Sequence, residues 1–389
     1  MTQALLTAIN PIYFSKILRW KNINHTPVGQ LFKVDQFHEY NRLIDINSVF
    51  SSRPFGDIVD RTGSVRLPFL FQINRPWTGA DNSSIGLEQV MQQRTQWYID
   101  QGQKLNLCWS GGIDSTSLVV AFLKHTSNLD QLRILYSPYS VYENRDFFNL
   151  LQTQYPQIEM IDISGDVYLS TKFDGLFVTG HGGDEFTASM DDSFYNKVGG
   201  ADGLSRSWKD YFYQSTGDQD LVDFTEQYFA LSGRRINTVL EARWWFYSMN
   251  KSQNHAVGNN SFLLDQPDAD LSSVTAFFDC KEFENYVYHN TDCIIDLSKG
   301  YLGYKHFLKE YIYQFDQNTD FYQNYGKVNS IQFNLYIEKK IVMTDNRWIC
   351  KLSDNSVVRT KNLPLLSKNE FDQAYGNQLD YLFNSPDAI

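Results

Sequence analysis

Cysteines and basic residues are scarce in this chain of 389 residues. It has four cysteines and no Cys-x-x-Cys pair, which argues against a disulfide scaffold and against a cysteine-rich zinc site. We therefore expect a reducing compartment. Lysine and arginine number 34 against 45 aspartate and glutamate residues, which gives a net charge of -11. Because an acidic chain repels phosphate backbones, this balance disfavours tRNA or DNA as the main partner.

Long apolar runs and common targeting or nucleotide signatures are also missing. No uninterrupted apolar stretch approaches the roughly 20 residues of a membrane-spanning helix. The first residues, Met-Thr-Gln-Ala-Leu-Leu, lack the basic segment and cleavage site of a secretory signal. We therefore expect a cytoplasmic protein that does not bind membranes. The Gly-x-x-x-x-Gly-Lys-Ser/Thr loop is absent from the sequence too, so transfer of a terminal phosphate is not indicated.

Core-forming residues, by contrast, are plentiful, since 42% of the chain is hydrophobic and 15% is aromatic. A segment dense in turn-forming residues divides the chain in two. The short, proline-containing segments before it predict a small strand-rich module over residues 1–84, and the rest predicts a larger domain over 85–389. Directly after the division, apolar residues at helical spacing predict a helix at about 87–98, capped by Asp81 or Ser83.

Strand and helix patterns alternate in the first part of the larger domain. We predict strands at 105–109, 132–136, 158–163 and 175–179, and helices at 115–125 and 146–155. This alternation is typical of an α/β fold in which helices flank a parallel sheet. Ligands of such sheets bind at the carboxyl ends of the strands. From about Ser205 onward, aromatic residues in helical patterns predict a helical C-terminal part, with a polar loop at 258–273.

The first motif is Ser110-Gly-Gly-Ile-Asp-Ser115, between a predicted strand and a predicted helix. The two glycines let backbone N–H groups approach an anion closely, and the helix start adds unpaired N–H groups and the positive end of its dipole. Ser110, Ser115 and Thr116 can add hydroxyl donors. Asp114 would repel a bare phosphate, but Mg²⁺ between the two would remove this conflict. The alternative interpretation is an ordinary glycine-rich turn at a helix start.

At these residues the sequence resembles the pyrophosphatase-loop ATPases of the adenine nucleotide alpha hydrolase-like superfamily, whose signature is S-G-G-x-D-S. The resemblance implies that ATP is cleaved between its α- and β-phosphates. It also implies that AMP is attached to an oxygen of the substrate and is then displaced by a nucleophile.

A second motif, Thr179-Gly-His-Gly-Gly-Asp-Glu185, is similar to the T-G-E-G-S-D-E segment of asparagine synthetases, β-lactam synthetases and lasso-peptide macrolactam cyclases. Its glycines allow a tight backbone path beside a ligand, and Asp184 offers a second metal carboxylate. The alternative interpretation is a flexible surface loop with an acidic pair.

A looser match follows in two pieces. Residues 275–284 resemble the P-F-L-D-x-x-F segment of the synthetase domain, and residues 303–310 resemble its G-x-K-x-x-L-R-E segment. The resemblance implies that Lys305 reaches the ATP phosphates and the negative charge that develops during amide formation, where a cation is chemically suitable. Alternatively, Lys305 is one of many exposed lysines on an amphipathic helix.

The resemblance, which covers about residues 85–310, also implies a set of ligand-binding residues. The implied Mg²⁺ ligands are Asp114 and Asp184. The implied ATP-binding residues are Cys108, Ser110, Gly111, Gly112, Asp114, Ser115, Leu135, Tyr136 and Gly180.

Three departures from the pattern matter. The second residue is Thr2, where glutamine-dependent asparagine synthetases carry a nucleophilic cysteine, and the module before residue 85 is short, so glutamine hydrolysis is unsupported. His181 replaces the glutamate of T-G-E-G, and a histidine there could deprotonate an attacking amine or serve a structural role. Glu241-Ala-Arg243 stands about thirty residues before the P-F-L-D-like segment, where the pattern has it directly adjacent, so we assign Glu241 no role.

These features predict an ATP-dependent carbon–nitrogen ligase with an asparagine synthetase-like domain and no functional glutaminase domain. It would adenylate a carboxylate, release pyrophosphate and join the acyl group to an amine on a small molecule or peptide. An RNA- or nucleobase-modifying enzyme of the same superfamily and a catalytically silent nucleotide-binding module remain alternatives. The sequence leaves the substrates and the oligomeric state open.

Overall fold

A computed structural model gives the fold of part of the chain. It describes residues 9–13, 38–51, 58, 60–65, 75–82, 85–163, 173–188, 190–251, 274–326, 348–352 and 357–360. The predicted loop at 258–273, Ser83 and Thr2 lie outside the described residues.

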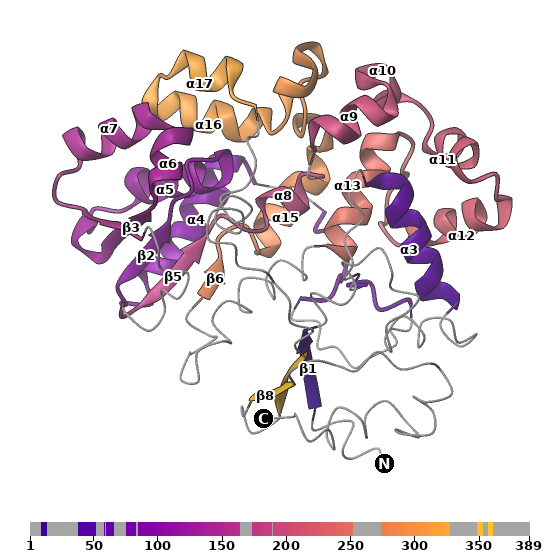
Figure 1. Ribbon diagram of the computed structural model, residues 1–389, viewed down its shortest axis with the longest axis horizontal. Helices are drawn as coiled ribbons and strands as arrows, with labels where there is room; N and C mark the ends of the chain where they lie inside the picture. The colour runs from indigo at the N-terminus through magenta and orange to yellow at the C-terminus, as the bar shows by residue number, and fades with distance from the viewer. Residues whose placement is uncertain are drawn as a thin grey trace.

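A five-stranded parallel sheet in the order β4-β3-β2-β5-β6 forms the centre of the α/β fold (Figure 1). Its strands are β2 (Leu105–Cys108), β3 (Leu132–Tyr136), β4 (Glu159–Asp162), β5 (Leu176–Thr179) and β6 (Val274–Ala276). The four predicted strands are confirmed. Strand β6 is not predicted by the sequence, because three residues are too few to show a periodic pattern. Leu105 and Leu107 of the central strand are fully buried, as expected where helices cover a parallel sheet.

Helices α4 (Leu87–Ile99), α5 (Ile113–His125) and α7 (Arg145–Gln154) follow the predicted pattern and flank this sheet. Ten of the thirteen residues of α5 are buried, so this helix is part of the core. The predicted cap of α4 is wrong for Asp81. The helix begins after Gly86 without a side-chain cap, and Asp81 instead forms an ion pair of 2.7 Å with Lys281.

A helical layer lies on the other side of the molecule and confirms the prediction of aromatic helices after Ser205 (Figure 1). It comprises α8 (Gly183–Phe186), α9 (Asp192–Val198), α10 (Gly200–Ser205), α11 (Trp208–Thr216), α12 (Gln219–Ala230) and α13 (Val239–Asn250). Every residue of α13 except Glu241 is buried. Most of the bulky aromatic side chains of these helices therefore belong to the core, while Tyr213 is half-exposed.

Residues from the predicted N-terminal module also belong to this packing. Helix α3 (His38–Phe50) packs against α11, α12 and α13, and its Phe50 ring lies 5.6 Å from that of Phe212. Strand β1 (Ile9–Tyr13) pairs antiparallel with β7 (Trp348–Leu352), which pairs with β8 (Val357–Thr360). Segments from both ends of the chain thus share one small sheet. The division at residue 84 stays a prediction.

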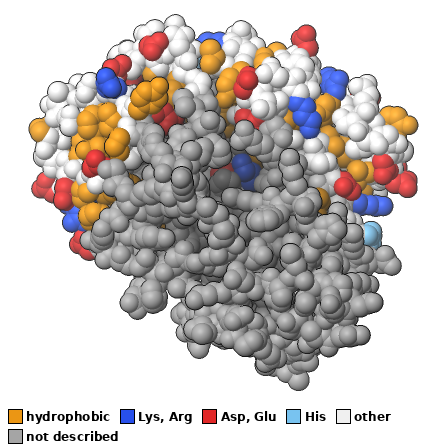
Figure 2. All heavy atoms as spheres, in the orientation of Figure 1, with side chains coloured by type: hydrophobic (Ala, Val, Ile, Leu, Met, Phe, Trp, Pro, Cys, Tyr) orange, Lys and Arg blue, Asp and Glu red, His pale blue; other side chains and the backbone are white. Residues whose placement is uncertain are grey.

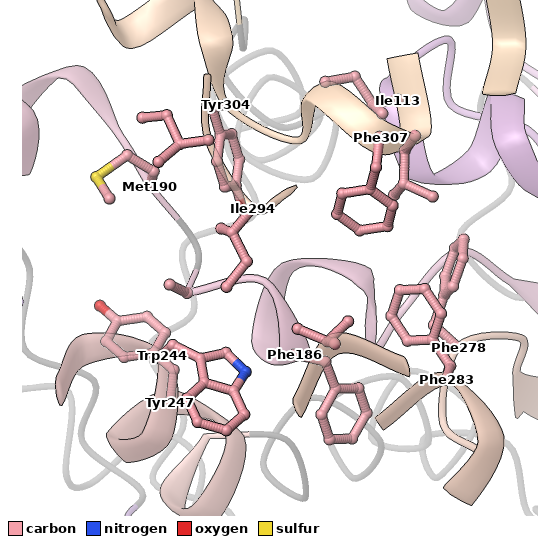
Figure 3. Packing of buried hydrophobic residues seen from close by; sticks show 14 of the residues in the cluster. Ile113, Phe186, Met190, Trp244, Tyr247, Phe278, Phe283, Ile294, Tyr304 and Phe307 are labelled. Carbon is pink, nitrogen blue, oxygen red and sulfur yellow. The ribbon is translucent and has the colours of Figure 1, made fainter. Parts of the chain in front are cut away.

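The sheet and the helical layer meet around the ring of Phe283. This residue belongs to α15 (Lys281–His289), and its ring centre lies 4.7 Å from Phe278, 6.3 Å from Phe307 and 6.4 Å from Phe186 (Figure 3). Phe307 lies on α16 (His306–Asp316), which packs on α5 and continues into α17 (Thr319–Asn324). These apolar contacts fix the elements that carry the motifs. None of the described helices is both long and apolar enough to cross a bilayer.

Candidate active site

The Ser110–Ser115 motif forms a tight loop between β2 and α5. Gly111 has a φ of +85°, and a Cβ atom there would lie 2.5 Å from the backbone oxygen of Ser140, so both the conformation and the space require glycine. Helix α5 starts after Gly112 without a side-chain cap, so backbone N–H groups and the helix dipole favour an anion at this end.

Hydroxyl groups brace this loop from within. The Ser110 and Ser115 oxygens lie 2.8 Å apart, and the Ser110 backbone N–H donates to the Ser115 hydroxyl. Thr116 is fully buried: its hydroxyl accepts from the Trp109 indole and donates to the Gly111 carbonyl. Thr116 therefore holds the loop's shape. Of the three hydroxyl groups predicted to donate to a ligand, those of Ser110 and Ser115 remain candidates.

The loop after β5 approaches the first loop closely because of its glycines. A Cβ atom at Gly180 would lie 2.8 Å from the Ser115 nitrogen, and one at Gly183 would lie 2.5 Å from Oδ1 of Asp114. Strand β5 is the direct neighbour of β2, so the two motifs share the carboxyl edge of the sheet. The structure thus brings the two sequence motifs into contact.

Lys305 joins the two motifs through their carboxylates. Its ammonium group bonds both oxygens of Asp114 and lies 2.7 Å from Oδ1 of Asp184. The Lys305 side chain is only 3% exposed, whereas those of Asp114 and Asp184 are 20% and 22% exposed. Tyr304 donates a further hydrogen bond of 3.2 Å to Asp184. We call Lys305, Asp114 and Asp184 the lysine cluster.

The backbone of Lys305 is strained. Its φ of 55° and ψ of 36° place a non-glycine residue in the left-handed region at the start of α16, which costs on the order of 1–3 kcal/mol. A hydrogen bond of 2.7 Å from its backbone N–H to the Ile294 carbonyl helps to hold this conformation. Lys305 is therefore a buried residue preceding the helix, and the alternative of an exposed helical lysine is wrong.

Electrostatics keep Lys305 charged. Burial opposes its charge, but the carboxylates of Asp114 and Asp184 outweigh burial and raise the pKa of Lys305 above its ordinary value. The lysine cluster holds one positive and two negative charges, so it has an excess of one negative charge before a ligand binds.

The carboxylates of Asp114 and Asp184 fit the chemistry of Mg²⁺. Both are hard oxygen donors, both are partly exposed, and both lie close enough to share one cation. No group of three or more histidine, cysteine or acidic side chains in the described part of the chain could hold a metal ion. A magnesium ion here would take two protein ligands and complete its shell with phosphate oxygens and water, as magnesium sites commonly do.

The remaining predicted ATP-binding residues line the same edge of the sheet. Cys108 ends β2 in register with Leu135 of β3 and with Thr179 of β5. Burial raises the pKa of the Cys108 thiol to about 12, so this thiol is not a nucleophile at neutral pH. Leu135 is fully buried, and Tyr136 is half-buried at the end of β3. Their contact with a nucleotide stays a prediction.

Two further residues from the sequence have clear positions. His181 is half-buried on the loop that follows β5, beside the glycines that touch Asp114, and its role stays a prediction. Glu241 caps α13: its carboxylate accepts from the backbone of Asn237 and Thr238 and pairs with Arg234 at 2.6 Å. These contacts satisfy Glu241 as a structural residue.

Three site residues were not predicted from the sequence. Tyr304 supports Asp184, and the Tyr325 hydroxyl donates to Glu143 directly beside Gly112. Only Tyr304 could have been suspected, because it precedes Lys305.

Neither the family models nor the curated proteins supply a relative. The chain matches no protein-family model, and it has no significant match among curated proteins. The case for function therefore depends on the geometry described above.

Proposed function

We propose that this protein is an ATP-dependent carbon–nitrogen ligase related to the asparagine synthetase-like members of the adenine nucleotide alpha hydrolase-like superfamily. It adenylates a carboxylate, releases pyrophosphate and lets an amine displace AMP. The observation that carries the proposal is the lysine cluster. Residues from three separate motifs, which lie up to 191 positions apart in the chain, converge beside the glycine loop.

Each part of the site has a task in this reaction. The backbone N–H groups at Ser110–Ser115 hold the pyrophosphate portion of ATP, and Asp114 and Asp184 hold Mg²⁺, which neutralises phosphate charge. Lys305 supplies a fixed cation beside the phosphates, where negative charge increases as pyrophosphate departs. Its strained backbone favours this role, because such strain collects at functional sites.

The amine partner is less constrained by the structure. His181 lies on the second loop, within the same motif as Asp184, and its imidazole is suited to accept a proton from an attacking amine near neutral pH. Without support for glutamine hydrolysis, we propose free ammonia or an amino group of a small molecule or peptide as the nucleophile.

The charge distribution supports a small substrate over RNA. On the face shown in Figure 2, basic and acidic side chains of the described residues are interspersed, and no single basic area stands out. Together with the net charge of -11, this gives a polyanion little to bind on the described part of that face.

The test is a product assay. The purified chain, ATP and Mg²⁺ are incubated with a library of carboxylic acids and amines, and AMP and pyrophosphate are measured. The proposal expects AMP formation that depends on an acid and is lost in Asp114→Asn. Release of ADP in place of AMP, or RNA-stimulated turnover with a steep salt dependence, would contradict it.

A further inference from the structure

A tyrosine and a glutamate stand over the glycine loop. The Tyr325 hydroxyl and Oε1 of Glu143 lie 3.6 and 3.4 Å from the place where a Cβ atom at Gly112 would be. The Tyr325 hydroxyl donates a hydrogen bond to that same Glu143 oxygen. Glu143 ends α6 (Pro138–Glu143), which follows β3, so the pair closes the loop from the side opposite β5.

Contacts with Lys309 and Phe321 hold Tyr325 in this place. Lys309 is 2% exposed, and its ammonium group donates to the backbone carbonyls of Tyr325 and Leu302 at 2.6 and 2.7 Å. The Tyr325 ring also lies 4.4 Å from the ring of Phe321. Lys309 follows Lys305 by one helical turn, so helix α16 fixes both the lysine cluster and the phenol beside it.

The Tyr325 hydroxyl and the Glu143 carboxylate interact with an anion in opposite ways. The Glu143 carboxylate can only accept hydrogen bonds, and it repels phosphate, whereas the phenol has one proton to donate. Burial, together with the carboxylates of Glu143, Asp114 and Asp184, raises the pKa of Tyr325 well above its usual range, so the phenol keeps this proton. The Tyr325 hydroxyl lies beside the glycine loop and donates to a carboxylate. When an anion binds in the loop, the hydroxyl can donate to a phosphate oxygen in place of that carboxylate.

We propose that Tyr325 donates a hydrogen bond to the pyrophosphate portion of the nucleotide and to departing pyrophosphate, and that Glu143 holds the phenol until that anion arrives. Tyr325 is then a binding residue for the leaving group, and Glu143 is a positioning residue that competes with the ligand. This inference rests on the proposed function, and it adds a donor that none of the sequence motifs contains.

Binding of inorganic pyrophosphate, measured by titration calorimetry with Mg²⁺ present, tests the exchange. A hydrogen bond to a charged group predicts that Tyr325→Phe weakens pyrophosphate binding by about tenfold or more. Glu143→Gln should bind pyrophosphate as tightly as the unchanged chain or more tightly, because the competing negative charge is gone. AMP, which lacks the pyrophosphate portion, should bind equally to all variants.

Tyr313→Phe is the matched control, since it removes a phenol of α16 whose ring stacks on Tyr322, and it should leave binding unchanged. Thermal melting checks that each variant folds. Equal losses in Tyr325→Phe and Glu143→Gln would mean that the pair is only structural and would overturn the inference. Weaker binding in Glu143→Gln only with Mg²⁺ present would identify Glu143 as a metal ligand and also overturn it.

The two proposals can fail separately. If the chain forms AMP and pyrophosphate but folded Tyr325→Phe binds pyrophosphate normally, only the role of Tyr325 is refuted. If the unchanged chain binds no pyrophosphate and releases no AMP, both proposals are refuted.

Discussion

Two ion clusters in this protein differ in charge balance, and we assign a structural role to one and a functional role to the other. The lysine cluster has one cation between two carboxylates. A second cluster, here called the arginine cluster, consists of Arg61, Arg75, Asp279 and Glu284. In it, Arg61 bonds both oxygens of Glu284 at 2.7 and 3.0 Å, and Arg75 pairs with Glu284 at 2.9 Å and with Asp279 at 2.7 Å.

The arginine cluster is balanced in charge. Two positive charges meet two negative ones, and Arg61 also donates to the backbone carbonyls of Ser248 and Arg75. The ring of Phe186 faces both guanidinium groups, at 5.6 and 5.0 Å. Arg61 is 1% exposed and Glu284 is 7% exposed, whereas Arg75 and Asp279 are 23% and 32% exposed. The charges of the cluster cancel, and the cluster fastens the segment around Arg61 to α13 and α15.

The lysine cluster is unbalanced in charge. It has an excess negative charge, its carboxylates are about one-fifth exposed, and its cation is held by a strained backbone beside the glycine loop. In the proposed function, this group accepts a metal ion and a phosphate together. Because Arg75 and Asp279 of the arginine cluster are exposed to a similar degree, charge balance and the position beside the loop, not exposure, distinguish the lysine cluster.

Removing the cation of the lysine cluster should give the largest functional effect. We expect Lys305→Met to lower the rate of AMP formation by about 10³-fold, because a fixed charge at the reacting phosphates is lost. Mg²⁺ should raise the melting temperature of this variant more than that of the unchanged chain, since two carboxylates are left without their ammonium partner. Product assays and melting curves measure the two effects.

Lys299→Met is the control for this change, because Lys299 is partly exposed and pairs with Asp296 at 3.7 Å, outside the lysine cluster. Lys299→Met should leave the rate of AMP formation and the effect of Mg²⁺ on the melting temperature nearly unchanged. A Lys305→Met variant with normal turnover would refute the distinction between the clusters.

Breaking the arginine cluster should instead reduce stability. Arg61→Met leaves the Glu284 carboxylate in the core with only one of its two guanidinium partners, and we expect it to lower the free energy of unfolding by about 3–5 kcal/mol. Activity per folded molecule should persist. Urea unfolding measures the loss, and Arg133→Met, which breaks ion pairs with the exposed carboxylates of Glu159 and Asp174, should cost about 1 kcal/mol or less. Equal losses in both variants would show that burial of the network around Arg61 adds nothing.

The two clusters also show what a sequence can and cannot predict. The strands and both glycine loops are local patterns, and they were predicted correctly at 105–109 and 175–179. The contact between Arg61 and Glu284 spans 223 positions and leaves no local trace. The cap predicted for Asp81 failed for the same reason, since a partner 200 positions away competes for its carboxylate.

The site shows the same limit. Asp114, Asp184 and Lys305 were found through motifs, yet neither the burial of Lys305 nor its left-handed backbone follows from any pattern. Glu143 and Tyr325 reach the loop only because α6, and α17 directly before Tyr325, pack where they do. Side chains placed by long-range packing, not by neighbours in the chain, are the part that needs a structure.

Lys309 is a third buried cation, and changing it should give the smallest effect, a change in how stability depends on pH. Its ammonium bonds two backbone carbonyls instead of a carboxylate. Burial, with some repulsion from Lys299, lowers its pKa from 10.5 to about 8. Lys305, which directly precedes the same helix, shifts the opposite way because two carboxylates outweigh burial there. Two lysines one helical turn apart thus show both outcomes of burial.

The sign of the pH effect follows from the protons bound. Between about pH 8 and 10.5 the unfolded chain keeps the Lys309 proton while the folded chain loses it, so the free energy of unfolding should rise with pH across this window. Relative to Lys309→Met, which lacks the titrating group, we expect a gain of about 1–3 kcal/mol. Urea unfolding of both chains from about pH 7.5 to about pH 11 measures the difference. If the difference in unfolding free energy between the two chains does not change with pH, the hydrogen bonds to the two carbonyls hold the proton on Lys309. Its environment would then stabilise the charge, as the lysine cluster does for Lys305.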